Sequence, residues 1–318
     1  MADTPLALAD MVKINDVSVR DMGATEIFND APVISQLNAI EASHGTDHKF
    51  IKETTAPTVG FRAPGDGRDH SKSGDTVVTV GLKILDASYH VEAALADSHP
   101  RGRDYVVQRE GNRHLRAAFS HGEKQLFYGA GNDAGGFTGL ADDVTNLKYT
   151  DSLMVVNAGG TAGSGIVLTD VWMLRTSGDE RFLNIVVGQN GEIAIGTSYE
   201  QMIDGANSKK RNCIVTPVEA WMTLATESSK AAARLVNLND STKPLTDDLL
   251  SALFELFDEN NPPTHILMGK RSHRQLQQSR TATTTTGAPA PWPTEWNGIP
   301  IISTKSVASY ATAVPVTP

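Results

Sequence analysis

The sequence is poor in cysteine, because Cys213 is the single one among 318 residues. One thiol cannot form a disulfide within the chain, and it cannot build a cysteine-rich zinc or iron–sulfur site. We expect Cys213 to be a small buried apolar side chain.

Long apolar runs and net positive charge are also missing. No 18 consecutive residues are apolar, so we expect no transmembrane helix and no membrane partner. Residues 1–15 carry Asp3 and Asp10 before the first lysine and contain no apolar core, which argues against a secretory signal. A formal charge of −9 argues against polyanion binding through net electrostatics, although it leaves room for a local basic patch.

Motifs for catalysis and cofactor binding are weak. The glycine-rich loop from Gly159 to Gly165 lies between two expected strands, but it lacks the Gly-Lys-Ser/Thr ending of a phosphate loop, and no helix follows. His44 and His48 have the spacing of a metal-binding pair, but a glycine interrupts the helix that would align them. We therefore expect no enzyme, no metal and no cofactor. A small α/β ligand-binding enzyme that uses the loop from Gly159 to Gly165 remains the alternative from another functional class.

One long helical pattern is present at residues 101–128. Small and large apolar residues recur there at steps of three and four: Val107, Gly111, Leu115, Ala118, Gly122 and Leu126. Each glycine weakens a helix by roughly 1 kcal/mol relative to alanine, so we expect another backbone close to this face. At ~1.5 Å per residue the helix would be about 42 Å long, which suits the bracing of an extended subunit.

The opposite side of this helix carries a basic stripe, formed by Arg109, Arg113 and Arg116. A solvated face with local pairing, such as Glu110 with Arg113, is the favoured interpretation. The functional alternative is contact with nucleic-acid phosphates or with acidic residues of a neighbouring subunit. The four tryptophans do not interleave with a basic patch, so sequence-specific nucleic-acid recognition is not expected.

A long hairpin with a polar tip is expected at residues 49–85. Residues 76–85 alternate with a period of two, and residues 58–62 are expected to form the other strand. Residues 64–75 between them contain no apolar side chain apart from the opening proline. An isolated hairpin is only marginally stable in water, so we expect this one to lie on a neighbour such as another subunit.

Further elements follow from local patterns. Helices are expected at residues 32–42, 228–235, 246–257 and 272–279. Strands are expected at residues 153–157, 166–168, 171–174, 213–216, 220–225, 265–269 and 298–304, with a hairpin at 182–197 that turns at Asn190-Gly191.

Several short strings in this order of elements carry a family likeness. They lie at residues 48–54, 57–62 and 71–73, and again at residues 271–281, 287–293 and 298–302. Together with the succession of arm, polar finger, long helix and mixed α/β region, they resemble the major capsid proteins of tailed double-stranded DNA bacteriophages with the HK97-type fold. Residues 234–238 resemble a strand of that family, in conflict with the helix expected just before them.

The resemblance implies an α+β protein with the HK97-type capsid fold. Its implied parts are an N-terminal arm, an extended β-hairpin loop, a peripheral domain with a long spine helix, an axial domain and a C-terminal segment that returns to the peripheral domain. Their boundaries are 1–47, 48–88, 89–150, 151–284 and 285–318.

The resemblance also implies a structural protein that self-assembles as pentamers and hexamers into an icosahedral phage head around double-stranded DNA. The implied partners are further copies, a portal protein, a scaffolding protein, cement or decoration proteins and non-specifically packaged DNA. Assembly would take place in the bacterial host cytoplasm, and the product would be the virion capsid. An encapsulin-like compartment shell is the alternative with the same fold. Candidate subunit-interface residues are Phe61, Arg62, Arg68, Lys72, Arg109, Arg113 and Arg116.

Overall fold

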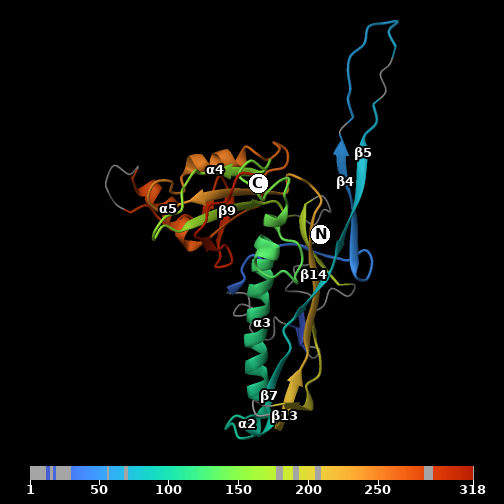
Figure 1. The fold of residues 1–318 in the computed structure, drawn as a ribbon, viewed down its shortest axis with the longest axis vertical. Coiled ribbons are helices and arrows are strands. Elements are labelled where there is room, and N and C mark those ends of the chain that lie inside the picture. The colour runs from blue at the N-terminus through green and yellow to red at the C-terminus, as the bar shows by residue number, and fades with distance from the viewer. Residues whose placement is uncertain are drawn as a thin grey trace.

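The structure is a computed structural model that describes residues 12–14, 17–18, 30–55, 57–67, 71–176, 182–188, 193–204, 209–282 and 289–317. Its body is elongated and built along the helix α3 (Arg103–Tyr128). A sheet-and-helix unit sits at one end of this helix, and a narrow finger projects beyond that end (Figure 1). Among the described residues, none of the helices combines the length and apolar character needed to cross a membrane.

The helix α3 confirms the long helix expected from the sequence. Its 26 residues span about 39 Å and end at Gly129, whose φ of 45° is in the left-handed region that favours glycine. A Cβ added at Gly111 would lie 2.8 Å from the Tyr89 hydroxyl, and one at Gly122 would touch side chains at 3.6 to 3.7 Å. The expectation of a neighbouring backbone on this face is therefore wrong, because side chains fill that space.

One face of α3 packs on the first sheet, in which the strand order is β2-β1-β11-β14-β10-β3 and β6 also pairs with β14. These strands are β1 (Val12–Ile14), β2 (Val17–Ser18), β3 (Ala39–Glu41), β6 (Lys83–Asp86), β10 (Leu183–Val187), β11 (Ile193–Ile195) and β14 (Val218–Thr226). Met222 of β14 and Leu85 of β6 contact the helix at Gly122. This contact explains why the second half of α3 contains its buried residues.

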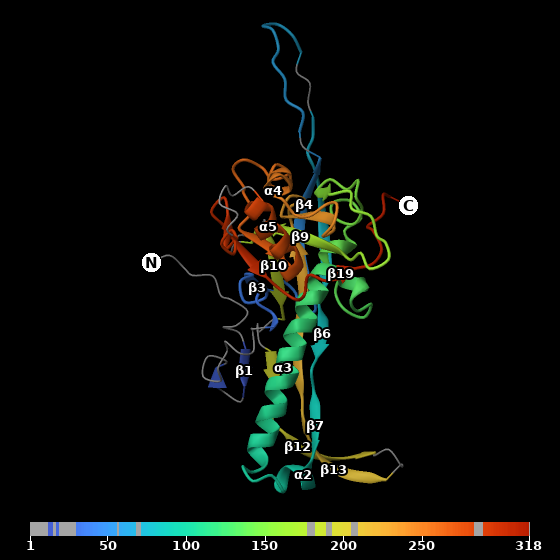
Figure 2. The ribbon, with the colours of Figure 1, turned by 90° about the vertical axis from the view of Figure 1, so that its left-hand side faces the viewer.

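A second sheet lies at the start of α3, with the order β12-β13-β7. It consists of β7 (Tyr89–Glu92), β12 (Tyr199–Asp204) and β13 (Lys210–Thr216), and the short helix α2 (Ala93–Asp97) follows β7. In the view of Figure 2, β12 and β13 project sideways from the body.

The sheet-and-helix unit contains the third sheet, with the order β17-β18-β16-β9-β15-β8 and with β19 on β9. Its strands are β8 (Val155–Asn157), β9 (Leu168–Leu174), β15 (Ala232–Leu238), β16 (His265–Met268), β17 (Glu295–Trp296), β18 (Ile299–Ser303) and β19 (Ser309–Tyr310). Two helices accompany it, α4 (Asp247–Phe254) and α5 (Lys270–Ala282). The Thr246 hydroxyl caps α4 by accepting from the Leu249 amide, as its sequence predicted. Two short 3-10 turns, η4 (Gly129–Gly131) and η5 (Leu140–Asp142), connect α3 to this unit.

The finger consists of β4 (Asp47–Thr55) paired antiparallel with β5 (Gly74–Gly81). The expected strand at residues 58–62 is wrong, because residues 57–63 form no strand and the first strand starts eleven residues earlier, at Asp47. Residues 57–63 instead continue the finger toward its tip without a strand partner, and Val59 and Phe61 among them are exposed.

Three other expectations fail because tertiary packing overrides local propensity. Residues 32–36 form turns that lead into β3, where a helix was expected. The alanine-rich residues before Arg234 belong to β15, which lies between β8 and β9 and is buried along its whole length.

The third failure concerns β10 and β11, which were expected to form a hairpin. Both run antiparallel to β14, with Val187 opposite Met222 and Ile193 opposite Ala220. They therefore follow one another along the same strand. The Asn190-Gly191 turn lies outside the described residues.

Candidate assembly interface

The base of the finger packs on the body, whereas apolar side chains farther along the finger are exposed. Phe50 and Leu82 are buried against Val186 and Ala225 of the body. Farther out, Ile51 and Val77 lie opposite each other in the β4–β5 register, yet they are 67% and 64% exposed. Two apolar side chains paired on a strand surface usually lie inside a protein or an interface.

The tip of the finger carries three of the residues expected at a subunit interface. The side chain of Phe61 is fully exposed, and Arg62 and Lys72 are exposed beside it. The Arg62 guanidinium donates to the Asp66 carbonyl at 2.6 Å, and the Ser71 hydroxyl donates to the Thr58 carbonyl at 2.7 Å, so the tip has internal order. Arg68 lies outside the described residues.

The basic stripe lies on the exposed side of α3, far from the fingertip within one subunit (Figure 1). Arg113 pairs with Glu110 at 3.1 Å, as expected from their spacing, and Arg116 lies 3.9 Å from Asp30. A groove of about 340 Å³ runs along this side and is lined by Tyr105, Gln108, Arg109, Asn112, Arg113 and Arg116. The stripe is thus solvated and partly neutralised by local carboxylates.

A buried carboxylate on α3 joins segments far apart in the sequence. Glu123 accepts hydrogen bonds from the Val33 amide at 2.8 Å and the Ile34 amide at 3.2 Å, and from the Thr304 hydroxyl. Burial raises the pKa of Glu123, and these donors oppose that rise. The side chain fastens the turn before β3 and the chain after β18 to the same point of the helix.

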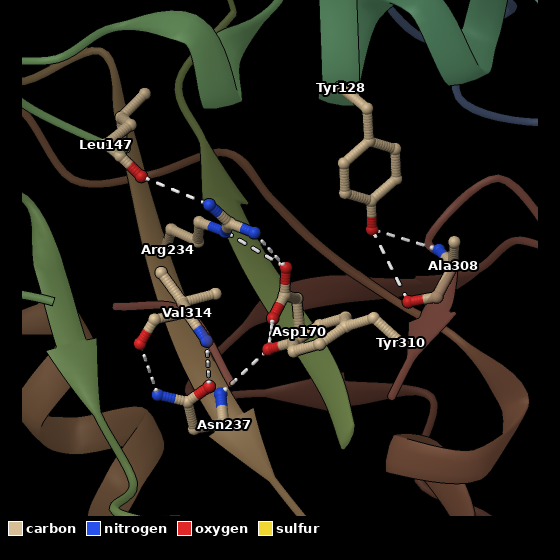
Figure 3. Close-up of polar contacts among 8 residues, drawn as sticks. All are labelled: Tyr128, Leu147, Asp170, Arg234, Asn237, Ala308, Tyr310 and Val314. Carbon is tan, nitrogen blue, oxygen red and sulfur yellow. Dashed lines mark hydrogen bonds and ion pairs between the residues drawn. The ribbon is translucent and has the colours of Figure 1, made fainter. Parts of the chain in front are cut away.

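A second buried cluster holds the third sheet to the C-terminal segment (Figure 3). The Arg234 guanidinium of β15 donates to one carboxylate oxygen of Asp170 from Nε at 3.0 Å and from Nη2 at 2.6 Å. The Tyr310 hydroxyl donates to the other oxygen. Arg234 also lies 4.9 Å from the centre of the Trp172 ring, a cation–π contact.

Asn237 extends this cluster toward the end of the described chain. Its backbone has a φ of 59°, and its side chain accepts from the Val314 amide at 2.8 Å. The backbone amide of Asn237 donates to the Tyr310 hydroxyl at 2.9 Å. Burial and the nearby Asp170 carboxylate raise the pKa of Tyr310, so this phenol stays protonated as a donor. The signals in the sequence for this cluster were single charged residues inside mostly apolar strands, Asp170 in β9 and Arg234 in β15.

The glycine-rich loop is occupied by contacts within the fold. The Gly159 amide donates to the Asn157 side chain at 2.9 Å, and the Gly160 amide donates to the Asn237 carbonyl at 3.0 Å. A Cβ at Gly160 would lie 2.3 Å from that carbonyl oxygen. Close backbone approach therefore explains this glycine, and these two amides are not turned toward a phosphate.

A spine-like helix along a sheet, a separate sheet-and-helix unit and a protruding finger together define the HK97-type capsid fold, as the sequence led us to expect. The family model of Major capsid protein GP7 matches residues 24–304, so the chain belongs to that family. It is a structural protein of a bacteriophage capsid shell, and its place is the virion capsid.

Comparison with solved structures agrees with this fold. The chain is similar to a chain in a structure of bacteriophage Epsilon15, with a TM-score of 0.65 and 16% identity over 87% of each chain. It also matches the bacteriophage JBD30 capsid, with a TM-score of 0.49, 11% identity and coverage of 93% of this chain and 100% of that chain. An SrpI encapsulin complex from Synechococcus elongatus matches with a TM-score of 0.44 and 10% identity over 73% of this chain and 99% of that chain. The search of curated proteins found no match.

Proposed function

We propose that copies of this chain form pentamers and hexamers that close into an icosahedral head around double-stranded DNA. The finger and the N-terminal arm would cross onto neighbouring subunits and interlock them. The proposal assigns residues 1–47 to the arm, 48–88 to the extended loop, 89–150 to a peripheral domain, 151–284 to an axial domain and 285–318 to a returning segment. It assigns no catalytic step to the chain.

The exposed apolar pair on the finger carries this proposal. Ile51 and Val77 lie beyond the small cluster at the finger base, and Phe61 at the tip is even more exposed than they are. Burying apolar surface contributes about 25 cal/mol per Å². A two-stranded hairpin with nothing packed on its faces cannot bury that surface by itself. Contact with other copies supplies it.

The remaining partners in the proposal are a portal protein, a scaffolding protein, decoration proteins and the packaged genome, with assembly in the bacterial host cytoplasm. The chemistry of the basic stripe supports a non-specific role toward DNA, because guanidinium groups contact phosphates without reading bases. A structure of the bacteriophage JBD30 capsid that is similar to this chain is decorated with minor capsid protein trimers.

Negative-stain microscopy of the expressed chain, combined with hydrogen exchange, tests the proposal. Rings, tubes or uniform shells are expected. Backbone amides of the finger beyond its base, at residues 51–77, should exchange faster in the isolated subunit than in assembled material, whereas residues 83–86, which pair with β14 inside one subunit, should be protected in both. A persistent monomer, or a finger that exchanges equally in both states, contradicts it.

A further inference from the structure

A small cavity lies between α3, β6, β14 and the loop that follows α3. Its volume is about 190 Å³, below the roughly 300–1,000 Å³ of typical ligand pockets, so it fits one side chain better than a cofactor. Leu85, Phe137 and Met222 supply its apolar lining.

The rim of this cavity carries charges of both signs. Lys83 and Asp133 lie among the lining residues. Hydrogen bonds from the Gly135 amide and from His121 lower the pKa of Asp133, so its carboxylate is charged at neutral pH. An incoming segment with an apolar side chain flanked by a cation and an anion would complement this rim.

The fingertip supplies the apolar side chain and the cation. Phe61 is fully exposed and Arg62 follows it, with the Arg62 guanidinium on the backbone carbonyl of Asp66. An aromatic side chain buries about 150–250 Å² when it enters a pocket, and aromatic residues with an adjacent arginine are typical of interface hot spots.

The fingertip cannot reach the cavity of its own subunit. The eight residues of β5 alone span roughly 26 Å from the finger base, and Phe61 lies beyond their outer end. In both ribbon views the finger points away from α3 (Figures 1 and 2). Phe61 can therefore enter this cavity only from another copy.

We propose that Phe61 of one subunit inserts into the cavity formed by Leu85, Phe137 and Met222 of a neighbouring copy, with Arg62 placed against Asp133 at the rim. This inference rests on the proposed shell-forming function and specifies one contact within it. The contact is heterologous, since finger and cavity are different surfaces, and it links subunits in a ring when the rotation between them closes, as in the proposed pentamers and hexamers.

Cross-linking between two variants, each with one added cysteine, tests this contact. Subunits with Gly60→Cys, which leaves Phe61 in place and has nothing within 4 Å of the new Cβ, are mixed with subunits with Ile84→Cys, which places a thiol at an exposed position of the cavity lining. The mixture is assembled, treated with a short bismaleimide and analysed on a denaturing gel. Cys213 is completely buried, so the unaltered chain gives the background.

The matched control replaces Ile84→Cys by Leu95→Cys. Leu95 is 66% exposed on α2, at the opposite end of α3 from the cavity, about 25 Å away along the helix. If Ile84→Cys lowers the yield of folded subunit, Lys83→Cys at the rim takes its place.

The expected result is several-fold more cross-linked dimer from the Gly60→Cys and Ile84→Cys mixture than from the Gly60→Cys and Leu95→Cys control. Shells of normal appearance with equal yields in both mixtures overturn the contact and leave the shell-forming function standing. Failure of the unaltered chain to assemble under any condition overturns the function, and the contact with it.

Discussion

The finger and the centre of the third sheet are both built from strand-forming residues, but they place their side chains in opposite environments. Every residue of β9 and β15 is buried, including Asp170 and Arg234. On the finger, by contrast, Ile51 and Val77 are largely exposed. The sheet is stabilised by contacts within one subunit, whereas the finger has apolar surface that only another molecule can cover. Stability measured on a free subunit should therefore depend on the sheet and hardly on the finger.

Breaking the buried ion pair should have the largest effect on the free subunit. Arg234→Ala leaves the Asp170 carboxylate buried without its cation, which costs about 3–5 kcal/mol of unfolding free energy. Chemical denaturation of the unassembled subunit measures this loss.

The matched control for that experiment is Arg113→Ala, which removes an exposed pair with Glu110. Such surface pairs contribute about 0–1 kcal/mol. Replacing both buried partners, as in Asp170→Leu with Arg234→Met, should restore much of the stability that Arg234→Ala removes. Equal losses for Arg234→Ala and Arg113→Ala would contradict the comparison between sheet and surface.

Two glycines offer a smaller and more local test. Gly160→Ala forces a Cβ against the Asn237 carbonyl, at 2.3 Å before relaxation, and should destabilise the subunit by about 1–3 kcal/mol. At Gly60 in the finger nothing lies within 4 Å, so Gly60→Ala should leave the unfolding free energy unchanged within about 0.5 kcal/mol. Thermal or urea denaturation of both variants measures the difference. A neutral Gly160→Ala would show that the loop relaxes freely.

The sequence predicted elements whose cause is local. The period of α3, the threonine cap of α4 and the alternation in β5 are each contained in a few neighbouring residues. The polar finger and the basic stripe could be found for the same reason.

Contacts between segments far apart in the sequence could not be predicted from such local patterns. Asp170 and Arg234 are separated by 64 residues, and Glu123 bonds to amides about 90 positions away, so no short-range pattern indicates either pairing. The alanines of β15 have helical propensity, but burial between two neighbouring strands decides their structure. The cavity proposed to receive Phe61 is likewise assembled from three separate stretches of chain.

The pH dependence of stability tests the contacts of Glu123. This buried carboxylate of α3 holds both the turn before β3 and the chain after β18. Its pKa is raised in the folded state, so folding favours the protonated form. The contribution of Glu123 to stability should therefore be greatest in acid and fall as the pH rises from its ordinary pKa through the raised value. Glu123→Gln keeps a carbonyl oxygen for the Val33 amide but cannot ionise.

The difference in unfolding free energy between the unaltered chain and Glu123→Gln, measured from ~pH 4 to ~pH 7, isolates this group, because the other carboxylates are common to both proteins. The unaltered chain should lose stability relative to the variant as the pH rises. A constant difference across that range would mean that Glu123 has the same pKa in both states.

Substitutions on the finger should have the smallest effect on the unfolding free energy of the free subunit. They should affect assembly instead. Ile51→Ser removes an apolar side chain that is 67% exposed, so the unfolding free energy should change by less than about 0.5 kcal/mol. In a shell the same side chain would be covered by a neighbour, and losing its burial should raise the subunit concentration needed for assembly, as followed by light scattering. Asp75→Ser, a polar replacement on the same finger at an exposed position that is not proposed as an interface residue, serves as the control for altered solubility. If Ile51→Ser and Asp75→Ser shift that concentration equally, the exposed apolar pair is not the surface that joins subunits, and the contrast between finger and sheet has no consequence for assembly.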